Sequence, residues 1–195
     1  ENLASGINMN VMFSQRGILV LCNSPHEMAL CRRWANAISM NGIDSEMLSR
    51  EDIKKCIPHI NLDCRFPVYG GFIQKRAGIA RHDAVVWGYA RAASAAGVDI
   101  VQQCEVTGMN TSASRVISLQ TTRGTISADR FALCVAGHSG HLAIMAGLRL
   151  PITSVALQAM VTEPVKPMLH VGLMSGHIHV YVSQSDRGEL VIGSG

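Results

Sequence analysis

The chain has 195 residues, of which 48% are hydrophobic and 16% are charged, and its formal net charge is +3. This length suffices for one domain with a sizeable core, or for part of a larger protein. The small charge and the scattered basic residues exclude a nucleic-acid surface, and no apolar run reaches the roughly 18 residues of a membrane-spanning helix. We therefore expect a globular protein with no nucleic-acid or membrane partner.

Cysteine usage and the first residue bear on location and on completeness. None of the six cysteines forms a CxxC pair, and several fall inside apolar runs such as ILVLC. We expect free, buried thiols in a reducing compartment, and hence a cytoplasmic protein. The chain begins with Glu1 and shows no basic-then-apolar leader, so we expect it to begin and end inside a longer protein.

The first elements in chain order are a strand and a capped helix. A short apolar run predicts a buried strand over 18–22. Ser24 precedes Pro25 and stands three residues before Glu27, which is the pattern of a capping box with proline at the first helical position. Gly42 is predicted to end this helix. Its buried face is predicted to contain Met28, Cys31, Trp34, Ala35 and Ile38.

Two more helices are predicted before residue 100. Ser49, with Asp52 three residues later, predicts a cap for a short helix that follows a strand. Residues 61–81 are expected to be extended and broken by glycines. A helix over 83–96 comes next and ends at Gly97. The face it buries is predicted to contain Val85, Val86, Tyr89, Ala92, Ala93 and Ala96.

The sequence pattern of the second half of the chain predicts mostly strands. VDIVQQ (98–103) predicts a strand directly after the helix, and residues 105–127 predict a meander of alternating strands. A buried strand over 129–137 is expected to run into a glycine-containing turn and a helix over 141–147. After Pro151 we expect long antiparallel strands of a second lobe. The whole pattern indicates a mixed α/β protein.

Common catalytic and metal-binding patterns are absent. The pairs His138/His141 and His177/His179 have no cysteine or carboxylate at ligand spacing, so no metal site is predicted. Ser139 lies in GHSGH, which is not a G-x-S-x-G nucleophile elbow. The chain contains neither G-x-G-x-x-G nor a P-loop.

Three charged or titratable residues, Arg81, His82 and Asp83, stand together where the apolar 83–96 helix begins. In one interpretation Asp83 caps the helix, Arg81 is solvated and His82 hydrogen-bonds locally. In the other, the positive end of the helix favours a neutral imidazole at His82, which is a nucleophile, and Arg81 favours an anionic partner such as a phosphate or a reduced flavin. Asp83 would then fix the tautomer of its neighbour. The residues alone leave both interpretations open.

The block GIARHDAVVWGYARAASAAGVDI, with VMFSQRG before it and YVSQSDRGELVIG after it, resembles the β subunits of heterotetrameric sarcosine oxidases, which are D-amino-acid oxidase-like flavoproteins. The resemblance implies an α/β (mixed α+β) fold: part of an FAD-binding dinucleotide-fold lobe plus part of a mixed-sheet substrate lobe. By resemblance, residues 1–80 contain mainly substrate-lobe elements, 81–150 belong to the FAD-binding lobe, and 151–195 are substrate-lobe strands.

The resemblance also implies two flavins. His82 matches the histidine that carries a covalent FMN, Arg81 is expected near that FMN, and His179 lies in a stretch expected to contact it. Non-covalent FAD is expected to contact Val106, Ala136 and Gly137.

The implied reaction is oxidative demethylation of sarcosine to glycine, giving hydrogen peroxide and either formaldehyde or methylene-tetrahydrofolate. The implied partners are an α subunit and smaller subunits of a heterotetramer, with tetrahydrofolate and NAD bound elsewhere in the complex. The family's N-terminal G-x-G-x-x-G and C-terminal glycine-rich turn are missing, and no catalytic or carboxylate-binding residue can be assigned. We therefore expect a central fragment that is inactive alone. Two alternatives stay open: an FAD-only oxidase or dehydrogenase of another secondary amine or amino acid, and a non-catalytic α/β scaffold.

Overall fold

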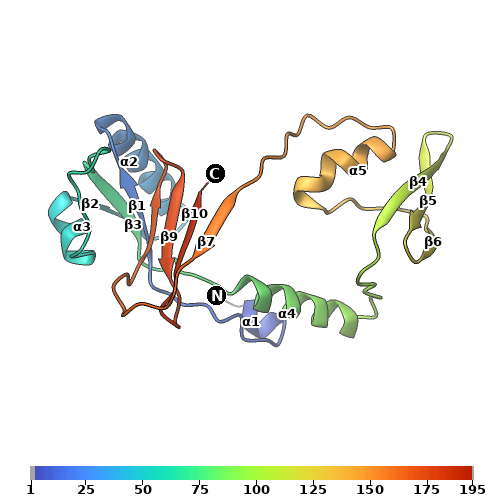
Figure 1. Cartoon of the computed structure of the whole chain (residues 1–195), viewed down its shortest axis with the longest axis horizontal. Helices are drawn as coiled ribbons and strands as arrows, with labels where there is room; N and C mark the ends of the chain where they lie inside the picture. The colour runs from blue at the N-terminus through green and yellow to red at the C-terminus, as the bar shows by residue number, and fades with distance from the viewer. Residues whose placement is uncertain (1–2, 195) are drawn as a thin grey trace. The chain divides into compact units, whose positions relative to one another are not determined.

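A computed structural model of the chain describes residues 3–194, which form two compact units. The first unit combines the residues up to Ala93 with those from Leu157 onward, and the second comprises Ser94–Ala156. Strands from both ends of the chain therefore belong to the first unit (Figure 1).

The first unit is built on a seven-stranded mixed sheet with the strand order β2-β3-β1-β8-β9-β10-β7. The strands are β1 (Ile18–Cys22), β2 (Glu46–Leu48), β3 (Gly70–Gln74), β7 (Gln158–Val161), β8 (Gly172–Ser175), β9 (Val180–Gln184) and β10 (Leu190–Ser194). β1 pairs in parallel with β8, and the other pairs in this sheet are antiparallel. The predicted mixed α/β fold is confirmed. The assignment of ranges to substrate and FAD lobes stays a prediction.

Alternation along β1 divides the core between the two faces of the sheet. Leu19 and Leu21 belong to a buried cluster with Ile53 of helix α3 (Arg50–Cys56). Cys22 belongs to a second cluster with Cys31 of helix α2 (Pro25–Ser39), and Val20 packs against it. One helix therefore covers part of each face.

Both predicted helix caps are present, with one difference in detail. Ser24 Oγ accepts a hydrogen bond from Glu27 N at 3.1 Å, and Ser49 and Asp52 form a reciprocal capping box. Glu27 Oε2, however, accepts from the backbone N–H of Asn23 at 2.6 Å rather than from Ser24. Trp34, predicted to be buried, is 61% exposed, because it borders open cavities beside the sheet although its ring lies near Phe72 of β3. That prediction is wrong.

Helix α4 (His82–Ala95) begins one residue earlier than predicted and buries a different face. Its buried residues are Ala84 and Gly88, and a Cβ at Gly88 would collide with the side chain of Ile7, just after helix α1 (Leu3–Gly6). The small residues at 84 and 88 thus admit the N-terminal segment. Members of the predicted apolar face, such as Val86 and Tyr89, are more than half exposed, so that prediction is wrong.

The second unit contains a three-stranded antiparallel sheet, which confirms the predicted meander. Its strands are β4 (Val106–Ser112), β5 (Arg115–Thr121) and β6 (Gly124–Ser127), followed by the 3-10 helix η1 (Ala136–His138) and helix α5 (Ser139–Met145). The strands predicted over 98–103 and 129–137 are wrong, because the structure is irregular through both segments up to η1. A strand needs a neighbour to complete its hydrogen-bond ladder, and neither segment has one within residues 3–194.

The six cysteines are all free thiols, and their burial differs from the prediction. Cys22 and Cys31 are buried, whereas Cys64 and Cys134 are exposed. Burial, aided by a hydrogen bond with Cys31, raises the pKa of the Cys22 thiol to about 12, so this thiol stays protonated. Within residues 3–194, no helix has the length and hydrophobicity needed to cross a bilayer.

Candidate functional site

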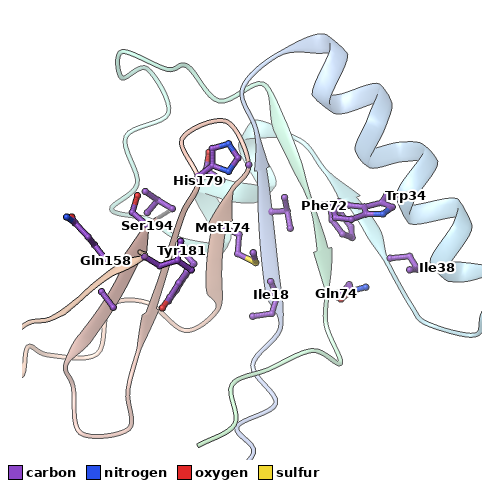
Figure 2. A pocket seen from close by; sticks show the side chains of 16 residues that line it. Ile18, Trp34, Ile38, Phe72, Gln74, Gln158, Met174, His179, Tyr181 and Ser194 are labelled. Atoms are coloured by element: carbon purple, nitrogen blue, oxygen red, sulfur yellow. The ribbon is translucent and has the colours of Figure 1, made fainter. Parts of the chain in front are cut away.

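A cavity of about 810 Å³ lies on the face of the seven-stranded sheet that α2 partly covers. Figure 2 shows Trp34 and Ile38 on the helix beside it, Ile18 and Met174 on strands at its centre, and His179 at the turn above. All the residues that line it belong to the first unit. The site is therefore defined without reference to the second unit.

The register of the sheet explains the floor of this cavity. Five consecutive pairings align a row of residues across six strands: Phe72, Val20, Met174, Tyr181, Gly193 and Ala159. Since side chains alternate between faces along each strand, the paired residues of one row share a face. The row is mostly apolar, so it presents a surface that suits a flat or apolar group.

Tyr181 depends on the smallest residue in that row. A Cβ at Gly193 would collide with the ring of Tyr181, so the ring lies directly over the glycine. The Tyr181 side chain is 44% exposed, and its hydroxyl makes no hydrogen bond to any residue between 3 and 194. This hydroxyl is available to a ligand in the cavity.

Other polar groups are spread around an apolar centre. Gln74, Gln158, Ser175, His179 and Ser194 line the cavity together with the apolar side chains of Ile18, Val20, Phe72 and Met174. An apolar cavity with a few polar groups is the usual form of a small-molecule site, in which the polar groups fix orientation.

His179 ends the turn between β8 and β9 and lines the cavity. Its φ of +49° is left-handed, a conformation that is uncommon for residues other than glycine, although histidine adopts it more often than most. The turn (176–179) begins with Gly176, which also lines the cavity. The resemblance implies that His179 contacts FMN, and this contact stays a prediction; the structure places His179 at this cavity.

A smaller cavity of about 400 Å³ lies next to the first on the same side of the sheet. Val20, Trp34 and Gly176 line both cavities, and Glu27 lines only the smaller one. Trp34 also contacts Phe72 of the floor row, with ring centroids 6.1 Å apart. Trp34 therefore contributes to the walls of both cavities.

The Arg81–His82–Asp83 triplet forms a second feature of this unit. Arg81 donates two hydrogen bonds to Asp83, Nε to Oδ1 at 3.2 Å and Nη2 to Oδ2 at 2.8 Å, and Ala84 N donates to Asp83 Oδ1. The Arg81 hydrogen bond is the main reason that the pKa of Asp83 lies below its usual value. Asp83 thus bonds to Arg81 and to its own helix start. Neither the interpretation in which Asp83 holds the His82 ring nor the one in which His82 hydrogen-bonds locally has such a bond among the described residues.

His82 itself is the first residue of α4. Its side chain is exposed and makes no hydrogen bond to any other described residue. The segment before it is fixed, because Ser14 and Ile79 exchange backbone hydrogen bonds and Arg81 N donates to Val11 O. A free imidazole on a fixed helix start is open to covalent attachment.

The three residues predicted to contact FAD lie in the second unit. Val106 opens β4 and pairs with Thr121, while Ala136 and Gly137 lie in η1. Ala136 has a φ of +46°, and Ser154 Oγ donates a hydrogen bond to Gly137 O. These three are therefore in a different unit from His82 and His179.

Sequence reasoning missed the residues of the floor row. Tyr181, Met174 and Phe72 lie on three different strands, and only the sheet register brings them into one line. The available signal was local: Tyr181 alternates with apolar residues in VYVSQ, and a glycine interrupts the strand opposite. It did not reveal which strands are neighbours.

Comparison with known proteins decides the family. A family model described as FAD dependent oxidoreductase (DAO) matches residues 1–195. The chain belongs to the FAD-dependent oxidoreductase family. It is 48% identical to sarcosine oxidase subunit beta of Rhodobacter capsulatus over 100% of this chain and 47% of the relative, and 47% identical to that of an Arthrobacter species over 100% of this chain and 49% of the relative. The resemblance read from the sequence is confirmed.

Solved structures show that the fold of this oxidoreductase is shared more widely. L-proline dehydrogenase from P. horikoshii matches with a TM-score of 0.81 and 19% identity, over 100% of this chain and 52% of that one. Glycine oxidase from Geobacillus kaustophilus matches with a TM-score of 0.75 and 17% identity, over 100% and 51%. The chain spans about half the length of these relatives.

The residues predicted to hold flavins are accessible at two places in this structure. Around Gly137 a Cβ would meet only Ser154 Oγ, at 3.9 Å, so a ligand can approach this backbone closely. His82 is exposed and unbonded, as an attachment point requires. Arg81 is half exposed, but two of its donors are already directed at Asp83.

Proposed function

We propose that the protein to which this chain belongs oxidatively demethylates sarcosine to glycine and produces hydrogen peroxide, with formaldehyde or methylene-tetrahydrofolate as the one-carbon product. The observation that carries the proposal is the identity of 47–48% with sarcosine oxidase β subunits over essentially the whole chain. The cavity is consistent with it, because an apolar centre with a few polar groups is the usual form of a small-molecule site.

Within the cavity, the chain's own residues bind and orient the amine. The apolar floor of Val20, Met174 and Phe72 offers contacts to the carbon atoms of the amine. The unbonded Tyr181 hydroxyl and His179 supply polar contacts at its wall. The flavins, when bound, accept a hydride from the amine and pass the electrons to oxygen.

His82 is the proposed attachment point of FMN, with Arg81 near that flavin and His179 in contact with it. Val106, Ala136 and Gly137 are the proposed contacts of non-covalent FAD. The proposed assembly contains an α subunit and smaller subunits in a cytoplasmic heterotetramer, with tetrahydrofolate and NAD bound elsewhere. This half of the β chain is proposed to be inactive alone.

The test uses the full-length protein, expressed with its partner subunits, as wild type, His82→Ala and His59→Ala. His59 is another exposed histidine and serves as the control. After acid denaturation and washing, intact mass and visible absorbance should show one flavin on wild type and on His59→Ala, and none on His82→Ala. Flavin retained by His82→Ala would exclude this attachment point.

A second candidate is an FAD-only oxidase or dehydrogenase of another secondary amine or amino acid. It is suggested by the names of two proteins that share this fold, L-proline dehydrogenase and glycine oxidase, which give other amino acids as substrates. In that case no flavin stays on wild type after denaturation, and sarcosine is oxidised more slowly than another amine.

A further inference from the structure

The turn between β8 and β9 is tied to the start of α2 by contacts that the proposed chemistry does not use. His177 Nδ1 lies 3.1 Å from Glu27 Oε1, and the Glu27 side chain is only 25% exposed. The His177 ring also packs against Phe66, with centroids 5.1 Å apart. One histidine of the turn is therefore held while the other, His179, lines the cavity.

Glu27 has two roles at this point. Its Oε2 accepts from Asn23 N at 2.6 Å, which fixes the carboxylate at the helix start, and its Oε1 remains for His177. An ordinary capping carboxylate bonds only to its own helix start. Here the cap residue also reaches a strand turn from the far end of the chain.

A second bond strengthens the same connection. Ser175 Oγ donates to Asn23 Oδ1 at 3.0 Å, and Asn23 Nδ2 donates to Phe66 O at 2.8 Å. Asn23 and Glu27 therefore hold both Ser175 and His177, the residues on either side of Gly176. Gly176 lines both cavities, and the space where its side chain would be is empty to 4 Å. Gly176 therefore makes no side-chain contact that could hold the turn.

We propose that His177, through Glu27, is the positioning residue that holds the β8–β9 turn so that His179 stands at the wall of the cavity. The left-handed conformation of His179 costs on the order of 1 kcal/mol and persists only when surrounding contacts impose it. The Glu27 and Asn23 contacts supply that constraint from one side of the turn. The inference rests on the proposed function only where the cavity is taken as the sarcosine site.

The test compares His177→Phe with His177→Asn in the full-length protein with its partner subunits. Phenylalanine keeps a ring against Phe66 but removes the hydrogen bond, whereas asparagine restores a donor near the Nδ1 position. His59→Phe is the matched control, the same substitution at an exposed histidine outside the cavity. Hydrogen exchange of peptides covering 172–184 and steady-state oxidation of sarcosine are measured for each variant.

In His177→Phe, exchange of the turn should accelerate about tenfold, the effect of losing one charge-assisted hydrogen bond. The KM for sarcosine should rise by a similar factor while kcat changes less than about twofold. His177→Asn should recover most of both effects, and His59→Phe should match wild type.

Unchanged exchange in His177→Phe would show that the His177–Glu27 contact does not hold the turn. Faster exchange with an unchanged KM would show that the contact holds the turn but does not place His179 for substrate binding. If wild type does not oxidise sarcosine at all, the proposed function fails. In that case the exchange comparison still decides whether the His177–Glu27 contact holds the turn.

Discussion

The two faces of the seven-stranded sheet differ in how completely they are covered. On one face, α3 and the loops around it close over Leu19, Leu21 and Ile73, and Ile53 is fully buried beneath them. On the other face, α2 covers Cys22 and Phe72, and the row that continues through Met174 and Tyr181 is left open as the cavity. Because side chains alternate along the same strands, one face of the sheet forms a closed core and the other keeps an open apolar surface.

The largest contrast is expected between Ile53→Ala on the closed face and Met174→Ala on the open one. Ile53 is 0% exposed, so truncation should lower the free energy of unfolding by about 3 kcal/mol. Met174 is 45% exposed, and its truncation should cost less than about 1 kcal/mol. Urea denaturation of the full-length protein measures both. Equal losses would show that the open face is packed in solution.

Gly71→Ala tests how closely the strands of this sheet are fitted together. An added Cβ would lie 2.5 Å from the carbonyl oxygen of Val20, a backbone atom that cannot rotate away. We expect a loss of about 2 kcal/mol in the free energy of unfolding, as for other overpacked sites. Gly6→Ala, with nothing within 4 Å of the new Cβ, is the control for the same urea measurement. A similar small effect in both variants would contradict the fit.

Local features of the fold could be predicted from the sequence, whereas features that depend on which segments are neighbours could not. The caps at Ser24 and Ser49 depend on residues three positions apart, so local pattern was enough. The exposure of Trp34 and the failure of 98–103 to form a strand depend on which segments are neighbours, and periodicity does not contain that information. For the same reason His179 was found through resemblance, whereas Tyr181 became visible only once β9 was placed between β8 and β10.

Gly193→Ala should affect the open face more than the fold. The new methyl group would collide with the ring of Tyr181, which can rotate away, so stability should fall by less than about 1 kcal/mol. The displaced ring should raise the KM for sarcosine about fivefold, within the range for one lost polar contact. In Tyr181→Ala, adding Gly193→Ala should then raise the KM no further. A further rise would mean that Gly193 acts independently of the ring.

The smallest expected effect concerns the cap of α3 and its dependence on pH. Hydrogen bonds from Ser49 are the main reason that the pKa of Asp52, in the cap of α3, lies below its usual value. A lowered folded-state pKa means that Asp52 stabilises the fold above the unfolded value of about 3.9, and that this contribution is lost as the pH falls through the folded pKa. Asp52→Asn should therefore be slightly less stable than wild type at neutral pH.

That difference between Asp52→Asn and wild type should disappear in acid. Thermal unfolding midpoints measured from pH 7 down to pH 2.5 follow it, and the same series at 1 M salt controls for surface screening. A difference that persists at the lowest pH would assign the loss to the amide itself rather than to the charge.

The parallel pairing of β1 with β8 also has a consequence for biosynthesis. Val20 lies beside Met174, so the centre of the sheet joins two strands that are far apart in the sequence and are therefore made at different times. While the intervening residues emerge from the ribosome, the edge of β1 that β8 will occupy stays unpaired. Such an edge invites contacts with other nascent chains and is a natural target for chaperones. Slow synthesis or truncation before residue 172 should thus favour aggregation over folding.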